Sequence, residues 1–172
     1  MFDPYYPDLT DAEITKEAMQ RKSIPAEVFT LVRKWAYTPT ADFIPTRIHR
    51  GERQFLLARR KEKPWKGAFF FPGGRIAPGE TPEEGMLRGC RRELGFIPDL
   101  LLCRFLLWQS IYNPECEHEG EPYFTMSGCW QIEMSHDQVV CLDSTQSEYR
   151  WFDAGSNKKF APYVQKAIDL LR

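Results

Sequence analysis

The sequence predicts one domain of mixed α and β structure. Three observations indicate this class: a length of 172 residues, short strand-like apolar runs spread over residues 41–152, and a strongly capped helix between two of these runs. Aromatic residues make up 14% of the chain, which argues against a disordered protein. We therefore expect a folded α/β domain with a sizeable core.

Residues 1–40 are expected to form an N-terminal extension of irregular structure and helices. Thr10 and Glu13 have the spacing of a capping box, which predicts a helix over residues 11–22. Pro25 suits the first turn of a second helix. The apolar residues of this second helix recur on one face at helical spacing: Val28, Leu31, Val32 and Trp35.

Residues 41–172 are expected to form the main domain. Its first strands are predicted over residues 41–48 and 54–59, with a turn at Gly51 between them. After a polar loop, residues 68–71 predict a buried strand that stops at a Pro-Gly-Gly turn. The later elements are strands over residues 101–112, 123–133 and 149–152, and a last helix that opens at Ser156.

The helix in the middle of the chain has the clearest boundaries. Thr81 can cap its N-terminus, Pro82 suits the first helical position, and Glu84 completes a capping box. The helix is expected to run to Leu94, because Gly95 follows where a left-handed residue commonly ends a helix.

Charge and composition exclude several classes of function. The chain holds 23 Lys and Arg against 24 Asp and Glu, so we expect no nucleic-acid partner. We also expect no membrane association, because no apolar run reaches the roughly 18–20 residues of a membrane span. The start lacks the pattern of a secretory signal, and the five cysteines form no Cys-x-x-Cys pair. We therefore expect reduced thiols and a cytoplasmic protein.

The segment over residues 73–96 carries the residues suited to chemistry. The chain leaves a buried strand through a double glycine, crosses a short loop and enters the capped helix. Arginines and glutamates alternate along this segment, and a polyphosphate needs both kinds of residue: carboxylates hold Mg²⁺, and arginine forks bind the phosphate oxygens. Arg91 and Arg92 are expected to be solvated or locally paired, although Arg92 lies on the side of the helix that faces Glu93.

This segment resembles the signature of Nudix hydrolases. The matching positions are Gly74, Glu80, Arg88, Cys90, Glu93, Gly95 and Phe96. Two positions depart from the signature, because Gly89 and Arg92 stand where the family has helix glutamates. In ordinary members those glutamates help to bind two or more divalent ions, so the departures argue against a multi-metal site and against the usual attack at phosphorus.

The departures resemble one Nudix subgroup, the GDP-mannose mannosyl hydrolases, and the likeness extends over residues 40–155. It implies an α/β/α sandwich with a mixed sheet, and one Mg²⁺, with Mn²⁺ as an alternative. It also implies hydrolysis of a nucleotide sugar such as GDP-mannose by attack at the sugar carbon. By analogy, the N-terminal extension is expected to mediate a homodimer.

The resemblance assigns roles position by position. Arg60 and Arg75 look like the arginines that contact the diphosphate and the leaving group, and Arg88 looks like the signature arginine that orients a glutamate or contacts substrate. Glu93 looks like the helix ligand of Mg²⁺. The second metal ligand would be the backbone carbonyl of Gly73 or Gly74. From its place in a polar loop, Trp65 is a candidate to stack on the nucleotide base.

The loop before Trp151 departs from the subgroup, which uses a glutamine metal ligand followed by a histidine base. Simple spacing puts Thr145 and Gln146 in those two places, so Gln146 would be a ligand only if the loop shifts by one residue. No histidine matches, and the base stays unassigned, with Asp143 and Glu148 as further candidates. Two alternatives therefore stay open: a pyrophosphatase that attacks phosphorus, and a non-catalytic nucleotide-binding or regulatory protein.

Overall fold

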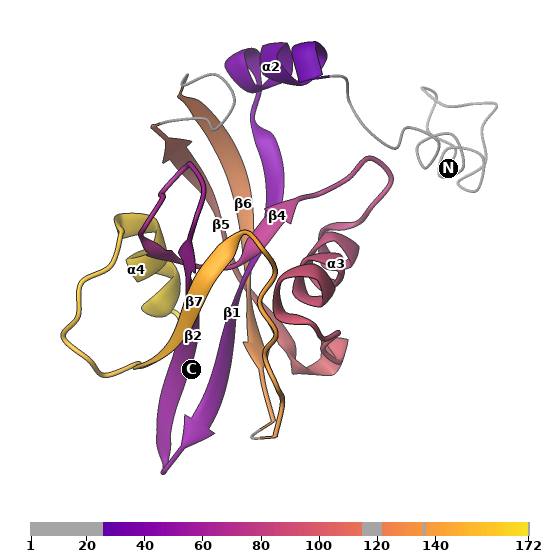
Figure 1. Cartoon of the computed structure of the whole chain (residues 1–172). Coiled ribbons are helices and arrows are strands. Elements are labelled where there is room, and N and C mark those ends of the chain that lie inside the picture. Colours follow the sequence, from indigo (N-terminus) through magenta and orange to yellow (C-terminus); the bar gives the residue numbers. More distant parts are fainter. Residues whose placement is uncertain (1–25, 115–121, 136, 172) are drawn as a thin grey trace, which may run out of the picture.

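The computed structural model describes residues 26–114, 122–135 and 137–171, which form a mixed sheet with helices around it (Figure 1). The strands are β1 (Thr38–His49), β2 (Glu52–Arg60), β3 (Phe69–Phe70), β4 (Gly73–Arg75), β5 (Cys103–Asn113), β6 (Tyr123–Glu133) and β7 (Gln146–Asp153). The helices are α2 (Ala26–Trp35), α3 (Pro82–Leu94) and α4 (Pro162–Ile168), with a short 3₁₀ turn, η1, at Leu100–Leu102.

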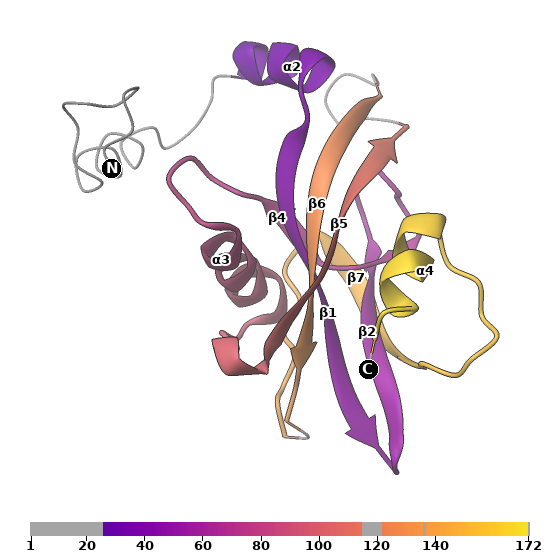
Figure 2. The same ribbon diagram turned by 180° about the vertical axis from the view of Figure 1, so that it is seen from behind.

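The main strand order is β3-β2-β1-β6-β5, and the sheet is completed by β4 on β1 and β7 on β2. The β1–β6 pair is parallel and the other pairs are antiparallel. Helix α3 lies against one face of the sheet and α4 against the other (Figures 1 and 2). The predicted α/β/α sandwich with a mixed sheet is confirmed.

Each face of the sheet has its own apolar core, and each core includes one helix. Met86, Cys90 and Leu94 of α3 pack with a cluster on one face that includes Phe43 and Leu56. On the other face, α4 contributes Val164, Ala167 and Ile168 to a second cluster. Burial of these two helix stripes is the main force that holds the layers together.

Strand β1 is central and nevertheless contains two prolines. Its outer partner is β4 over residues 40–42 and β2 over residues 46–49. Pro45 lies between these two stretches, where the neighbour of β1 changes from β4 to β2. Its missing N–H therefore removes no backbone hydrogen bond to either strand. This change of partner follows directly after the pairing with β4, where the glycine turn lies.

Helix α3 begins and ends as the sequence predicts. Thr81 accepts a hydrogen bond from the Glu84 N–H at 3.2 Å, and the Glu84 carboxylate accepts from the Thr81 N–H at 2.8 Å. Gly95 ends the helix in the left-handed region with φ 79°. A Cβ at Gly95 would lie 2.9 Å from Cys141 Cβ, so this cap also lets the loop before β7 approach closely.

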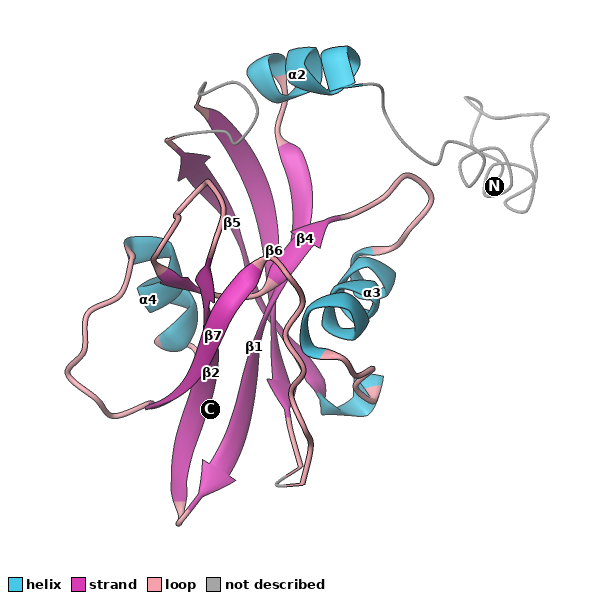
Figure 3. Ribbon diagram, in the orientation of Figure 1, coloured by secondary structure: helices cyan, strands magenta, loops and turns pink. Residues whose placement is uncertain are grey.

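The last helix begins later than predicted, at Pro162 and not at Ser156. A loop connects β7 to α4 (Figure 3). Ser156 instead donates its N–H to the Asp153 carbonyl in a turn, and Phe160 packs edge-on against Phe55 at 5.6 Å before the helix starts. The predicted helix over residues 11–22 lies outside the described residues.

Helix α2 forms as predicted, but its apolar face is largely solvent-exposed in the described part of the chain. The exposed fractions are 43% for Val28, 59% for Leu31, 37% for Val32 and 80% for Trp35. None of the helices in the described ranges combines the length and apolar character that a membrane crossing requires.

Candidate functional site

The glycine turn at β4 is held against β1 by a close backbone approach. Gly73 pairs with Asp42 across the antiparallel ladder. A Cβ at Gly73 would lie 2.1 Å from Asp42 Oδ1 and 2.6 Å from Asp42 Cα. Only glycine leaves room for this contact, which brings the Asp42 carboxyl up to the turn.

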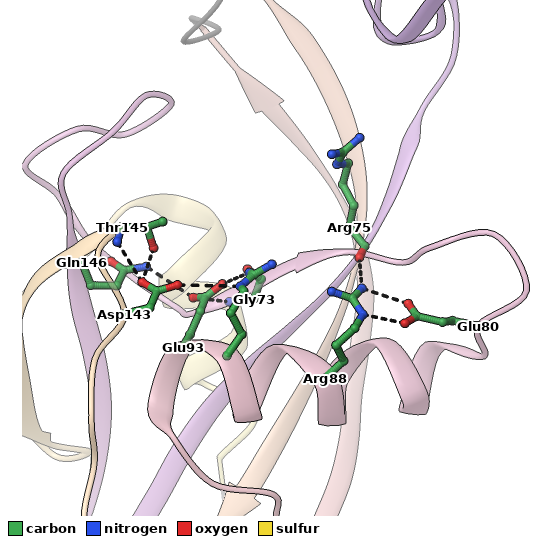
Figure 4. Close-up of polar contacts among 9 residues, drawn as sticks. Gly73, Arg75, Glu80, Arg88, Glu93, Asp143, Thr145 and Gln146 are labelled. Carbon is green, nitrogen blue, oxygen red and sulfur yellow. Dashed lines mark hydrogen bonds and ion pairs between the residues drawn. The ribbon is translucent and has the colours of Figure 1, made fainter. Parts of the chain in front are cut away.

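Glu93 lies in the last turn of α3 and is almost completely buried, with 2% of its surface exposed. Its Oε2 accepts the Gly73 N–H at 3.1 Å and a hydrogen bond from Gln146 Nε2 at 3.3 Å. Burial raises the pKa of the Glu93 carboxyl, while the Arg92 guanidinium and the Gly73 N–H act in the opposite direction. The helix, the glycine turn and β7 therefore meet at one carboxylate (Figure 4).

Arg92, the residue that replaces a signature glutamate, inserts its guanidinium into this cluster. Its Nη2 forms an ion pair with Glu93 Oε1 and donates to the Gly73 carbonyl at 3.2 Å. Its Nε lies 3.7 Å from Asp143 Oδ2. Arg92 is paired locally, with Glu93, which agrees with the expectation. Its contact with the Gly73 carbonyl was not predicted.

Gln146 reaches Glu93 because the β2–β7 ladder is irregular at this point. Arg59 pairs with Glu148, and the next residue, Arg60, pairs with Gln146, so the register shifts by one residue. Whether Gln146 takes the ligand position of the subgroup stays a prediction, because the register shift describes strand pairing and not the alignment with the subgroup. The Gln146 Oε1 atom is buried without a hydrogen-bond partner among the described residues.

The other loop candidates are engaged elsewhere. The Thr145 hydroxyl and N–H both donate to Asp143 Oδ1, at 2.5 and 2.9 Å. The Glu148 carboxylate accepts from Arg59 at 2.6 Å, and Arg150 adds a second contact. Neither Thr145 nor Glu148 lines the cavity described below.

Arg88 lies farther back along α3 and braces the loop that follows β4. Its guanidinium donates to both Glu80 oxygens, at 2.5 and 2.9 Å, and to the Arg75 carbonyl at 2.7 Å. Glu80 also accepts the Ala77 N–H at 2.8 Å, so it ties the loop to Arg88. The Arg75 side chain itself points away from α3 (Figure 4), so Arg88 holds the backbone from which Arg75 projects.

A cavity of about 410 Å³ lies beside this cluster, between the glycine turn, β1 and the loop over residues 60–65. The part of its wall that the described residues form contains five cations and two carboxylates: Arg33, Arg60, Lys63, Arg75, Arg92, Asp42 and Glu62. Burial lowers the pKa of the Arg75 guanidinium, and neighbouring Arg33, Arg88 and Arg92 act in the same direction, while Tyr123 opposes them. Such crowding of cations favours an anionic ligand.

Two further predicted site residues line the cavity from the loop after β2. Arg60 donates from Nε to the Pro64 carbonyl at 2.7 Å. Trp65 donates its indole N–H to Asn113 at 3.1 Å and stacks on Phe70 with a centroid distance of 5.5 Å. One face of the Trp65 ring is therefore occupied by Phe70, and the ring is held in place at the cavity wall.

Asp42 is the site residue that the sequence analysis missed. It lines the cavity, and its Oδ2 accepts hydrogen bonds from Ser127 at 2.5 Å and Thr40 at 2.9 Å. Burial raises its pKa to about 7, while the Ser127 and Thr40 hydroxyls oppose the rise. A carboxyl with such a pKa can take up a proton near neutral pH. The sequence signal was an acid near the start of a predicted strand.

The structure therefore gathers the predicted residues into two neighbouring groups and leaves Arg88 behind them as a brace. Gly73, Glu93 and Gln146 meet at the end of α3, with Arg92 among them. The second group lies on the cavity wall: Arg60, Trp65, Gly73, Gly74 and Arg75.

Residues 38–171 match the model of the NUDIX domain family, which is most of the chain. The chain belongs to the Nudix family. Among curated proteins, 47 residues are 45% identical to an ADP-ribose pyrophosphatase of Methanocaldococcus jannaschii, a segment that covers 27% of this chain and 28% of that protein. The similarity to this pyrophosphatase thus lies in a limited part of both sequences.

Solved Nudix structures share the fold at low sequence identity. The NUDIX domain of Shewanella oneidensis NrtR, crystallised with ADP ribose, aligns with a TM-score of 0.61 and 20% identity over 90% of this chain and 95% of that one. A MutT/nudix family protein from Enterococcus faecalis aligns with a TM-score of 0.56 and 19% identity over 85% of this chain and 57% of that one. The chain thus spans less than two thirds of the first curated relative and of the Enterococcus protein.

Nudix hydrolases generally use divalent metals. Glu93, the Gly73 carbonyl and Gln146 Oε1 are oxygen donors of the kind that Mg²⁺ prefers. However, Gly73 O and Glu93 Oε1 both contact the same guanidinium nitrogen of Arg92. A divalent ion on these atoms would lie against a fixed positive charge, so the residues as arranged do not fit a resident Mg²⁺.

Proposed function

We propose that this Nudix domain hydrolyses a nucleoside diphosphate linked to a second group, with a nucleotide sugar as the substrate class. The observation that carries the proposal is the cationic cavity at the glycine turn, whose lining includes Arg60, Arg75 and Arg92. A volume of about 410 Å³ falls in the range of small-molecule sites. The segment shared with an ADP-ribose pyrophosphatase supports the same substrate class.

In this proposal, side chains of the protein hold the diphosphate. Arg60 and Arg75 bind phosphate oxygens through their guanidinium forks and neutralise the charge that develops on the departing phosphate. Trp65 offers an aromatic edge for the base or sugar beside them. Mg²⁺ or Mn²⁺, expected from the resemblance, is not part of this proposal, because Arg92 contacts two of the expected donors.

Asp42 completes the proposal as the group that accepts a proton from the attacking water. Among the described residues it is one of two carboxylates on the cavity wall, and the other, Glu62, lies in the exposed loop after β2. Attack at the sugar carbon releases the whole nucleoside diphosphate, whereas attack at phosphorus gives two monophosphates. Both routes require a proton acceptor near the bound diphosphate.

Hydrolysis of GDP-mannose and ADP-ribose in ¹⁸O-labelled water, with products identified by mass spectrometry, tests this function. Label in the free sugar means carbon attack, and label in a monophosphate means phosphorus attack. Arg75→Ala should lower kcat/KM about a hundredfold, whereas the control Arg91→Ala, an exposed residue outside the cavity, should leave it unchanged. No product from either substrate would refute the hydrolase.

A second candidate is a nucleotide-binding Nudix protein without turnover. The replacement of two signature glutamates by Gly89 and Arg92 favours it. Thermal stabilisation by ADP-ribose or GDP-mannose without product formation would support this alternative.

The expected homodimer belongs to the same proposal. Helix α2 presents an apolar face, with Leu31 59% and Trp35 80% exposed, which a second copy of the chain would cover. Size-exclusion chromatography with light scattering should give twice the chain mass of 20.2 kDa, and Trp35→Glu should give the single mass.

A further inference from the structure

Arg92 makes the contacts that a bound cation would make. Its guanidinium meets one carboxylate oxygen of Glu93, the backbone carbonyl of Gly73 at 3.2 Å and, more distantly, Asp143 Oδ2 at 3.7 Å. Two of these three oxygens are the donors from which a Mg²⁺ site was expected. The positive charge on them is supplied by the chain itself.

We propose that Arg92 is the built-in cation of this site, occupying a latent divalent-metal site and binding the substrate's diphosphate in place of a metal. The nucleotide part of this inference rests on the proposed function, whereas the metal part rests on the site geometry alone.

The packing around the Arg92 guanidinium gives it a defined position. A Cβ at Gly74 would lie 2.9 Å from Arg92 Nη2, so the second glycine of the turn leaves the space that Arg92 fills. Glu93 is 2% exposed and would be a buried carboxylate without a charge partner if Arg92 left. Both the available space and the charge of Glu93 therefore hold Arg92 at the turn.

The oxygen atoms around this position also support the latent metal site. Gln146 Oε1 is a buried acceptor without a hydrogen-bond partner among the described residues, and its amide group touches Glu93. With Arg92 removed, Glu93, the Gly73 carbonyl, Gln146 and Asp143 would offer oxygen donors from three separate segments, a set that suits Mg²⁺ or Mn²⁺. In the described ranges, no group of three or more His, Cys, Asp or Glu offers an alternative metal site.

The outward side of Arg92 supports the second half of the proposal. Its side chain is 47% exposed and lines the cavity together with Arg60 and Arg75. A guanidinium has five N–H donors, so the contacts with Glu93 and Gly73 leave others to meet a phosphate oxygen. A bound diphosphate would then contact both Arg92 and Arg75. Arg92 would supply the positive charge that a metal ion supplies to the phosphate oxygens in a metal-dependent site.

Manganese binding tests the metal part without any nucleotide. Free Mn²⁺ is measured by electron paramagnetic resonance with the wild type, Arg92→Ala and the control Arg91→Ala. The wild type and Arg91→Ala should bind Mn²⁺ weakly. Arg92→Ala should bind one Mn²⁺ ion with an affinity at least about tenfold higher than that of the wild type. Tight binding of one Mn²⁺ by the wild type, or equal weak binding by all three, would overturn the latent site.

Thermal melts provide a readout that keeps the test valid if Arg92→Ala folds poorly. Arg92→Ala should melt below the wild type and recover with Mg²⁺, whereas the wild type should not respond to Mg²⁺. Arg92→Lys keeps a charge but loses the fork, so it should melt closer to the wild type and stay insensitive to Mg²⁺. Equal Mg²⁺ responses in the wild type and Arg92→Ala would contradict the proposal.

Calorimetric titration with ADP tests the phosphate part. In EDTA the wild type should bind ADP, and Arg92→Ala should lose about tenfold or more in affinity and regain it with Mg²⁺. A wild type that binds ADP only when Mg²⁺ is added would overturn the inference. If the wild type binds no ADP at all while the Mn²⁺ result holds, the proposed function fails but the built-in cation stands.

Discussion

Replacement of Asp42 by asparagine should make the protein more stable at alkaline pH while removing its activity. The Asp42 carboxyl has a pKa of about 7 in the folded protein, against 3.8 ordinarily, mainly because it is buried. Between these two pH values the folded state holds a proton that the unfolded state has released. Stability therefore falls as pH rises through this interval, and the penalty is fully present above about pH 7.

The magnitude follows from the two pKa values. A pKa difference of about three corresponds to roughly 4 kcal/mol of unfolding free energy, as an upper bound. The asparagine side chain of Asp42→Asn carries no charge, so this loss should disappear. Its amide accepts the Ser127 and Thr40 hydroxyls more weakly than a carboxylate does. The net gain above pH 7 should therefore be about 1–3 kcal/mol.

Urea unfolding followed by tryptophan fluorescence between about pH 5 and pH 8 measures this effect. The wild type should lose stability across the range and Asp42→Asn should lose much less, since other shifted groups such as Glu93 are present in both proteins. Glu83→Gln, the same chemical change at an exposed position in the first turn of α3, should leave the slope as in the wild type. Parallel wild-type and Asp42→Asn curves would refute the reasoning.

Three further substitutions probe the frame of the site. Gly73→Ala would bring a Cβ to 2.1 Å from Asp42 Oδ1 and should cost about 1–3 kcal/mol in urea unfolding; an unchanged midpoint would contradict the close approach. Arg88→Ala removes the fork to Glu80 and should cost about 1 kcal/mol because the pair is partly exposed, and it should raise KM more than it lowers kcat; a pure kcat loss would instead indicate contact with substrate. Gly89→Glu should lower the melting temperature, because its Cβ would lie 3.1 Å from a ring carbon of Phe43 and its carboxylate would be buried; an unchanged melting temperature would show that the core gives way.

Local signals made α3 predictable from the sequence. Thr81, Pro82 and Glu84 act within one turn, and Gly95 acts at the residue that follows the helix, so each reports on its own neighbourhood. The last helix shows the limit of such signals. Its start is delayed to Pro162 because Phe160 packs on residues that are distant in the sequence.

The same limit explains which residues of the candidate site could be predicted from the sequence and which could not. The approach of the double glycine to Glu93 follows a known spacing and was predictable, although the choice between Gly73 and Gly74 was not. Asp42 instead depends on a hydrogen bond from Ser127, 85 residues away. The position of Gln146 depends on a register shift within the β2–β7 ladder, which no local pattern announces. Long-range pairing decides these positions.

The two departures from the Nudix signature are both matched by other features of this chain. At position 89, the absence of a side chain leaves room for Phe43 of β1, whose ring would lie 3.1 Å from a Cβ there. At position 92, the arginine occupies space that Gly74 leaves beside the turn. A glutamate at position 89 alone would therefore clash with Phe43. A glutamate at position 92 alone would leave the space beside Gly74 without the guanidinium. The site is accordingly better understood as a rebuilt charge arrangement, with a guanidinium on the glycine turn, than as a metal site that has only lost ligands.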